Sequence, residues 1–207
     1  LGWVKNGEPA GTEGLAKRLE GIQITLVEKG GSAPGMYGGG FIKPGLGTKD
    51  GVNYKTHIES YGWQSWRSNG ESSGTMGEAK RLEGICIQVQ NPGAAGDIEY
   101  QTHVQTYGWQ NWVKDGAESG TSGQAKRLEG IKIRLTGELA EHYDIYYRVH
   151  AQTFGWLDWA KNGAPSGTAG YAKRLEGIQI ILVPKGQPAP AKNYGGITSV
   201  RASYIAK

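Results

Sequence analysis

The sequence has little of several residue types, and each shortage excludes a class of protein. Its 207 residues include one cysteine, Cys86, so a disulfide within the chain and a zinc ribbon are excluded. No apolar run approaches the ~18 residues that span a membrane, so we expect no membrane insertion. Two phenylalanines and two methionines stand beside eleven tyrosines, seven tryptophans and 35 glycines. This composition favours a turn-rich all-β protein.

The charge is mild and evenly spread. The formal net charge is +4, and the Lys and Arg residues alternate with Glu and Asp along the chain. This pattern is typical of a solvated surface, so we expect no nucleic acid partner. The chain starts at Leu1 without a Met, which indicates a processed or excised piece of a longer protein.

A short block, AKRLEG followed by alternating apolar residues, occurs four times. The blocks are residues 16–21, 79–84, 125–130 and 172–177, and successive blocks start 63, 46 and 47 residues apart. Self-similarity at this period is typical of one supersecondary unit copied along the chain. Fold and function are therefore best considered repeat by repeat.

Each block predicts a strand with a bulge. In the third copy the apolar residues of IKIRL (131–135) alternate with charged ones, which is the period of a strand with one face in a core. Leu128 joins that face only if one residue is extra, so we expect a bulge at Glu129 and Gly130. Arg127 and Glu129 share the opposite face. We interpret them as an interrepeat ion pair or hydrogen-bond anchor, with a ligand clamp as the alternative.

The last three blocks each follow a second strand-like segment. These segments read YKTHIESYGWQSW (54–66), YQTHVQTYGWQNW (100–112) and YRVHAQTFGWLDW (147–159). Asn-Gly or Asp-Gly comes next (69–70, 115–116, 162–163), which favours a hairpin turn with positive φ, and then a GTxG loop. We predict three or four short strands per repeat and at most one helical turn, near 138–143.

The first and fourth copies are nearly identical, which gives the order A, B, C, A. A period of three favours closure by three repeats, because closure avoids open sheet edges. We predict an all-β fold in a pseudo-threefold β-prism-like arrangement; the alternatives are a β-trefoil-like fold and a four-bladed closed array. The predicted boundaries are a partial repeat (1–27), a Gly/Pro-rich linker or long loop (28–53), a three-repeat β domain (54–183) and a tail (184–207).

The partial repeat lacks its first segment, and the end of the tail has strand-like alternation. We therefore predict that residues 197–207 donate the missing strand, either within the chain or to the next copy, which would give self-association through the tail. The alternative is a cloning or proteolytic boundary in a longer array.

Polar and aromatic residues recur in the same order on the outward face of each first strand. An aromatic plate beside hydrogen-bonding side chains suits a sugar, whose C–H face stacks on a ring; a purely structural role is the alternative. The candidate ligand-binding residues are His57, Glu59, Tyr61 and Trp63, then His103, Gln105, Tyr107 and Trp109, then His150, Gln152, Phe154 and Trp156.

The tryptophans of each repeat form a pair three residues apart. An unbroken strand places such residues on opposite faces, so we expect one of each pair to be buried and the other at least partly exposed. His57, His103 and His150 fill one position in three repeats. They could meet as a metal site on the threefold axis, but a hydrogen bond that fixes the neighbouring loop is the simpler interpretation. We predict no metal and no cofactor.

Catalysis has little support in the sequence. Each obvious carboxylate, such as Glu83, Glu129 or Glu176, recurs in every repeat, whereas an active site needs one unlike constellation. The sequence contains no nucleophile elbow, phosphate loop or HExxH helix. We therefore predict that the chain is not an enzyme.

The combined pattern resembles a known repeat family. The segment Y-x-T-H-x-x-x-Y-G-W-Q-x-W, the Asn/Asp-Gly turn, GTxG and A-K-R-L-E-G-I-x-I-x-L are similar to the clostridial hydrophobic repeats with a recurring tryptophan, the ChW repeats. The likeness covers three complete repeats and the back half of a fourth. The resemblance implies a secreted or cell-surface protein of Gram-positive bacteria and a carbohydrate or protein ligand.

These observations lead to one expected function and one rival. We expect a non-catalytic extracellular binding module that recognises cell-wall or host carbohydrate through its repeated Trp-edged and Tyr-edged patches. The rival is a structural module that forms a surface fibre or layer through protein contacts.

Overall fold

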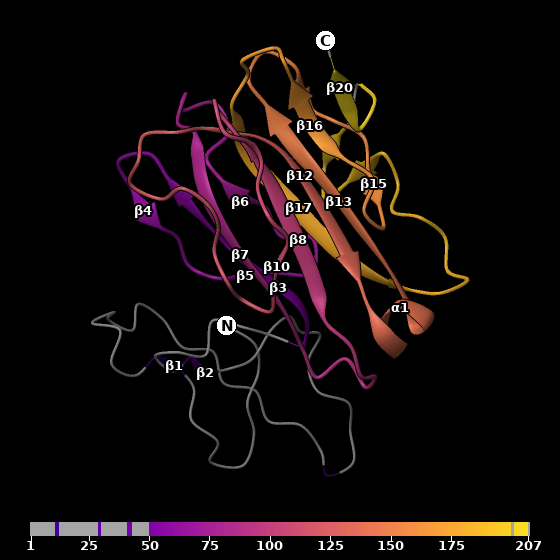
Figure 1. The fold of residues 1–207 in the computed structure, drawn as a ribbon. Helices are drawn as coiled ribbons and strands as arrows, with labels where there is room; N and C mark the ends of the chain where they lie inside the picture. The colour runs from indigo at the N-terminus through magenta and orange to yellow at the C-terminus, as the bar shows by residue number, and fades with distance from the viewer. Residues whose placement is uncertain (1–10, 13–28, 30–40, 43–49, 200, 207) are drawn as a thin grey trace. The chain divides into compact units, whose positions relative to one another are not determined.

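Each complete repeat folds around one long antiparallel strand pair. The computed structural model describes residues 11–12, 29, 41–42, 50–199 and 201–206. The first strand of each pair comes from the YxTH-type segment and the second from the AKRLEG block. The pairs (Figure 1) are β3 (Gly51–Ile58) with β7 (Leu82–Gln90), β8 (Ile98–Val104) with β12 (Leu128–Leu135), and β13 (Tyr143–Ala151) with β17 (Leu175–Pro184). We call these the second, third and fourth repeats.

Short strands widen each pair into a sheet. On one side they come from the same repeat: β4 (Gly62–Trp63) and β5 (Arg67–Ser68) pair with β3, β9 (Gly108–Trp109) and β10 (Val113–Lys114) with β8, and β14 (Gly155–Trp156) and β15 (Ala160–Lys161) with β13.

On the other side, each sheet receives a strand from a different repeat. The donated strands carry the sequence Ser-Gly before the second loop. β6 (Ser73–Gly74) pairs with β17, β11 (Ser119–Gly120) with β7, and β16 (Ser166–Ala169) with β12. The second repeat thus joins the fourth, the third joins the second, and the fourth joins the third. The cycle is complete with three repeats.

A buried tyrosine secures each join. Tyr100 of the third repeat accepts a hydrogen bond from the backbone N–H of Ile87 in the second repeat, at 3.0 Å, and donates to the carbonyl of Ala117. Tyr54 bridges Ile180 and Glu71 in the same way, with an N···O distance of 3.2 Å to Ile180. Burial raises the pKa of both hydroxyls, although the backbone hydrogen bonds oppose that shift. The tyrosines therefore stay neutral and hold adjacent repeats together.

One hydrophobic core is shared by all three repeats. Alternate residues of every long strand point inward, as the period-two pattern predicts. The core includes Val52, Tyr54, Ile58, Ile85, Ile98, Tyr100, Ile131, Ile133, Tyr147, Val149, Ile178 and Ile180. Burial of this face explains why one repeat would not fold alone: its apolar side has no cover until the neighbouring sheets arrive.

The predicted bulges and turns are confirmed. The register of β8 on β12 shifts between Leu128 and Gly130, and the other two pairs shift at the equivalent place. Asn69 and Gly70 have φ of 45° and 89°, and the other two Asx-Gly turns have similar values. The side-chain oxygen of Asn69 also accepts the backbone N–H of Val52, at 3.1 Å, which fixes the start of β3.

The remaining elements are short. Helix α1 (Gly137–His142), a little longer than the single turn expected, lies between β12 and β13. No helix in the described residues has the length and apolar character needed to cross a membrane. The tail contains β18 (Asn193–Tyr194), β19 (Ile197–Thr198) and β20 (Tyr204–Ala206). The chain divides into Leu1–Gly47 and Thr48–Lys207; in the first unit β1 (Gly11–Thr12) pairs in parallel with β2 (Phe41–Ile42).

The all-β class is confirmed, and within the described residues no sheet closes into a barrel. In the same residues the exchange of strands between repeats returns to its starting repeat after three steps, so the four-bladed alternative is wrong. The β-prism-like arrangement stays a prediction. The partial repeat and most of the linker lie outside the described residues, and so does any pairing of the tail with that repeat. Within the described residues, β20 of the tail pairs in parallel with β16 of the same chain (Figure 1).

Candidate functional site: three tryptophan patches

Both tryptophans of a repeat lie on the outer face of its sheet. Trp63 pairs with His57, and Arg67 pairs with Tyr54. The chain therefore advances four residues from Trp63 to Arg67, while the opposite strand covers only three between Tyr54 and His57. The extra residue is a bulge, and it turns the side chain of Trp66 to the same side as that of Trp63. The third and fourth repeats have the same offset. The prediction that the pair lies on opposite faces is therefore wrong. Neither ring is buried in the second and third repeats, whereas in the fourth Trp156 is buried and Trp159 is half-buried, as predicted for one ring of each pair.

A cation on the long strands lies beside each tryptophan pair. It belongs to one pair of directly opposed residues on the outer face, which we call the rung. The rung consists of Lys55 and Cys86 in the second repeat, Gln101 and Lys132 in the third, and Arg148 and Gln179 in the fourth. Each rung carries one cationic and one uncharged side chain, although the cation comes from the first strand in two repeats and from the second strand in the other.

The cations contact the indole rings at cation–π distances. Lys55 Nζ is 5.0 Å from the Trp63 ring centroid and 5.1 Å from that of Trp66. Burial raises the pKa of the Cys86 thiol, although Lys55 opposes the shift, so no thiolate neutralises the lysine. Within the described residues Lys55 forms no ion pair and no hydrogen bond. We call Lys55, Trp63 and Trp66 the Lys55 patch.

The other two patches are defined by the equivalent residues. In the Lys132 patch (Lys132, Trp109, Trp112), Lys132 Nζ is 4.3 Å from the Trp109 ring centroid. In the Arg148 patch (Arg148, Trp156, Trp159), Arg148 Cζ is 5.3 Å from the Trp156 centroid and 4.6 Å from the Trp159 centroid.

A buried charge cluster underlies each patch. Glu83 forms an ion pair with Arg81 at 2.8 Å, and its other oxygen lies 3.2 Å from Nδ1 of His57. That second oxygen also accepts the backbone N–H of Gly123 from the third repeat, at 3.2 Å. The His57 ring meets the edge of Trp63 with centroids 5.4 Å apart. The cluster thus orients the tryptophan and joins two repeats.

The same cluster recurs in the other repeats, with one glutamate per histidine. His103 lies 3.3 Å from Glu129, and His150 lies 3.1 Å from Glu176. Burial lowers the pKa of His150 below its ordinary value, although Glu176 opposes the shift. The described residues contain no group of three or more His, Cys, Asp or Glu side chains placed to hold a metal. The histidines do not meet on an axis, which leaves the structural interpretation. The Arg–Glu pair itself lies within a repeat, and the glutamate makes the interrepeat bond.

The other predicted ligand-binding residues lie at the loop beside each patch. Tyr61 and Tyr107 expose 53% and 55% of their surface, whereas Phe154 is half-buried against Tyr171. Glu59 forms an ion pair with Arg81. Gln105 and Gln152 are half-buried, and their backbone N–H groups bond to Arg127 and Arg174. These residues flank the tryptophans.

The Arg148 patch is covered by the chain's own tail. We call residues 185–206 the latch. Trp156 is 8% exposed, against 37% for the equivalent Trp63, and Arg148 is fully buried. The guanidinium donates to Gln179 Oε1 at 2.7 Å, and then to four latch acceptors: the carbonyls of Lys192 (2.9 Å), Tyr194 (3.0 Å) and Ile197 (3.2 Å), and Ser199 Oγ (2.8 Å).

Further contacts fix the latch along its length. Trp159 Nε1 donates to the carbonyl of Ala191 at 3.1 Å, and the Tyr194 ring meets the edge of Trp159. Lys192 pairs with Asp158 at 2.9 Å. The latch then forms the parallel pairing of β20 with β16. The Arg148 patch therefore already holds a polypeptide, in the form of the hairpin of β18 and β19.

Sequence reasoning missed the cations and the second tryptophan of each patch. Lys55, Lys132 and Arg148 were visible as charged residues on the outer face, but the cation moves between strands, so simple alignment of the repeats hides it. The bulge that turns Trp66, Trp112 and Trp159 to the outer face contains no glycine, so the sequence gives no sign of it.

Comparison with known proteins gives a family but no close relative. The family model described as Clostridial hydrophobic W (ChW) matches residues 1–28, 57–91, 103–137 and 150–184, more than half of the chain. No curated protein and no solved structure matches it. The four matched segments coincide with the four repeats, and the chain belongs to the ChW family.

Proposed function

We propose that this chain is a non-catalytic binding module that works in surface assembly, with each tryptophan patch holding a hairpin of polypeptide like that of β18 and β19. One observation carries the proposal: the Arg148 patch is filled by the latch. The rival expectation from the sequence, assembly through protein contacts, thus becomes the leading one. A secreted or cell-surface location, which the family resemblance implies, is part of the proposal.

The contacts of the latch are those of general polypeptide recognition. Three of the four latch acceptors on Arg148 are main-chain carbonyls, and the Trp159 indole also donates to a main-chain carbonyl. Main-chain contacts supply affinity that does not depend on residue type, while side-chain positions supply selectivity. A cation beside two aromatic rings therefore suits a hairpin that presents several carbonyls to one side.

The two open patches offer the same chemistry. Lys55 and Lys132 each bring a cation to the rung that Arg148 occupies, with an indole within 5.0 Å and 4.3 Å respectively. An ammonium has three donors and no acceptor, so carbonyl oxygens are suitable partners. Trp63 is also the most exposed of the described tryptophans, as expected for an uncovered patch.

Carbohydrate recognition is a second candidate, favoured by the exposed tyrosines. Tyr61 and Tyr107 lie at equivalent loops, with Lys80 Nζ and Lys126 Nζ 5.8 Å and 5.5 Å from their ring centroids. Glu78 accepts a hydrogen bond from the Tyr61 hydroxyl at 2.9 Å. A ring with one free face beside polar groups suits a sugar. Against this candidate, a cation already contacts an indole of both open patches.

Sedimentation of the full chain over a range of concentrations tests the proposal. We expect association that weakens when Lys55 or Lys132 is replaced by alanine. Lys114→Ala is the matched control, since Lys114 is exposed and pairs with Asp97 at 2.7 Å outside the patches. A chain that stays monomeric, yet changes its tryptophan fluorescence with cell-wall sacculi and loses that response in Tyr61→Ala, would favour the carbohydrate candidate instead.

A further inference from the structure

We propose that the Lys55 patch binds the latch of a second copy of this chain. The inference rests on the proposed function and names its partner. The latch has no acidic residue and contains Lys185, Lys192 and Arg201, and the part that contacts Arg148 is the tight hairpin of β18 and β19 with its turn at Gly195 and Gly196. Its seat on the Arg148 patch shows what recognition requires: a cation on the rung, a neighbouring indole pair, and a turn from the next repeat.

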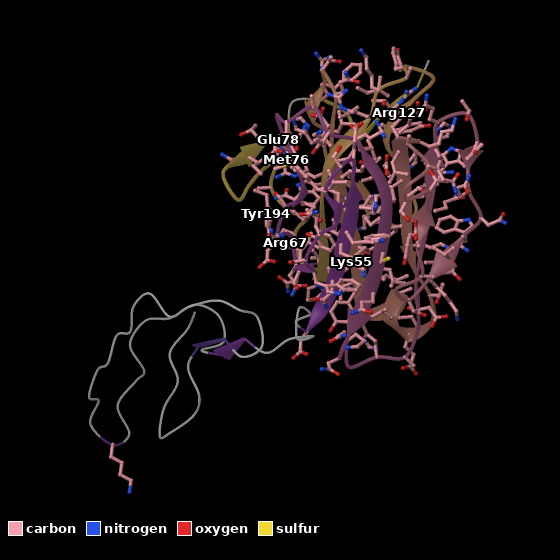
Figure 2. All side chains as sticks on the ribbon, turned by 90° about the vertical axis from the view of Figure 1, so that its left-hand side faces the viewer. Lys55, Arg67, Met76, Glu78, Arg127 and Tyr194 are labelled. Carbon is pink, nitrogen blue, oxygen red and sulfur yellow. The ribbon has the colours of Figure 1, made fainter. Side chains whose placement is uncertain are left out.

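The turn completes the seat of the latch. Tyr194 Oη lies 3.5 Å from the carbonyl of Asn69, and a Cβ on Gly70 would lie 2.5 Å from the same hydroxyl. Asn69 and Gly70 belong to the second repeat, so two repeats build the Arg148 patch. Figure 2 labels Tyr194 of the tail, together with Lys55 on β3.

The Lys55 patch has all three parts. Lys55 occupies the rung position of Arg148, Trp63 and Trp66 match Trp156 and Trp159, and the third repeat supplies the turn at Asp115 and Gly116. Gly116 donates to the carbonyl of Ile87 at 2.6 Å, and Gly70 donates to that of Ile180 at 2.7 Å. The two turns are therefore anchored in the same way beside their patches.

The Lys132 patch differs at the position of the second indole. Arg134 lies over Trp112, with its Cζ 4.2 Å from the ring centroid, and pairs with Glu99 at 2.6 Å. The equivalent positions beside Lys55 and Arg148 carry Gln88 and Ile181, neither of which is charged. The ion pair with Glu99 holds the Arg134 guanidinium over the ring that would receive the latch, which favours the Lys55 patch as the seat.

Charge also favours the Lys55 patch. In the Arg148 patch Asp158 pairs with Lys192 of the latch. Beside the Lys55 patch, Gly84 contacts both Glu118 of the third repeat and Trp63. A Cβ added to Gly84 would lie 3.1 Å from Glu118 Oε1, so this carboxylate lies next to the patch. In the fourth repeat Pro165 occupies the position of Glu118, so the Lys132 patch lacks this carboxylate.

The hinge for such an exchange is in place. Residues 184–189 are exposed, and Pro188 and Pro190 lie between β17, which ends at Pro184, and the part of the latch that touches Arg148. A latch released from its own patch, with β20 freed from β16, can therefore reach a neighbour while the three long strand pairs stay intact. Exchange of an identical segment between copies is a recognised route to self-association.

The first experiment adds a synthetic peptide of residues 184–206 to the full chain and follows binding by calorimetry. We expect one site, weakened at least about tenfold by Lys55→Ala, because a hydrogen bond to a charged group contributes on that scale. Lys114→Ala should bind like the unaltered chain. Absence of binding, or binding unaffected by Lys55→Ala, overturns the inference.

The second experiment frees the latch within the chain. Arg148→Met removes the four bonds that it donates to the latch, so we expect sedimentation to show stronger association than in the unaltered chain, and Lys55→Ala in the same background to reverse it. An Arg148→Met chain that stays monomeric, or that associates equally with Lys55→Ala, contradicts the inference. Association of the unaltered chain that needs Lys132 and ignores the peptide would leave the proposed function standing and this inference overturned.

Discussion

Replacing Arg148 by methionine should release the latch while leaving the three sheets folded. The substitution keeps a long apolar side chain on the rung and removes five donated hydrogen bonds, four of them to the latch. It also removes the contacts of the guanidinium with Trp156 and Trp159. Burial already lowers the pKa of Arg148, with Asp158 opposing that shift, yet the group is charged throughout the ordinary pH range.

The magnitude follows from the number and kind of bonds. A hydrogen bond to a charged group contributes about 1.5–3 kcal/mol, but the freed carbonyls regain water once the latch lifts, so simple addition overestimates the loss. Counting about half of that sum, with each bond near the lower end of this range, gives a net loss of about 3–4 kcal/mol. Since each 1.4 kcal/mol is tenfold, opening of the latch should become roughly a hundred to a thousand times more frequent.

Amide hydrogen exchange measures this opening directly. Amides of residues 193–199 and 204–206 should exchange faster in Arg148→Met, while those of β8 and β12 keep their protection. Arg134→Met is the matched control, since Arg134 is exposed and its single ion pair contributes at most about 1 kcal/mol. Unchanged exchange in the latch would refute the reasoning. Arg148→Lys, which keeps a cation with fewer donors, should fall between the two.

Three further predictions concern the joins between repeats and the base of the latch. Tyr100→Phe leaves Ile87 N–H and Ala117 C=O without their partner, so it should lower the free energy of unfolding by about 1–3 kcal/mol in a denaturant titration. Tyr107→Phe is the control and should change this free energy little, because Tyr107 is exposed. Gly120→Ala places a Cβ 2.4 Å from the carbonyl of Glu83 and should destabilise by at least about 2 kcal/mol more than Gly77→Ala, which has the same backbone preference but open space; equal effects on melting temperature would contradict the donated-strand join. Burial acts to raise the pKa of Asp144, but hydrogen bonds from Lys161, Lys185 and Asn162 together hold it below its ordinary value. Stability from this group is therefore fully present above the unfolded pKa of about 3.9 and is lost only as pH falls from there through the lower folded pKa, so Asp144→Asn should lower the melting temperature most at about pH 7 and by a smaller amount at about pH 3.

Much of the fold was predictable because it depends on local rules repeated three times. The alternation in IKIRL, the Asx-Gly turns and the extra residue before Gly130 each follow from the period of a strand and the freedom of particular residues at positive φ. Closure by three repeats followed from the order A, B, C, A. Which strand crosses to which sheet could not be predicted, since Ser119 and Gly120 look like a loop until a partner edge is present.

The candidate sites were predicted in part. The outward face of His57 and Trp63 was correctly identified from the pleat. The two tryptophans of a pair were wrongly expected on opposite faces, because a bulge without a glycine leaves no mark in the sequence. The role of Arg148 was hidden for another reason. Its partners are carbonyls of residues 192, 194 and 197, and a contact with a main-chain atom leaves no residue-type pattern to detect.

The central claim is that a cation beside two indoles forms a seat for a polypeptide hairpin, and the indole N–H resonances of Trp63 and Trp66 test it most directly. Titration of the full chain with the peptide of residues 184–206 should shift both resonances with one saturating curve, and should leave those of Trp156 and Trp159 near their starting positions. Shifts of Trp63 and Trp66 with wall saccharide, and none with the peptide, would contradict the claim.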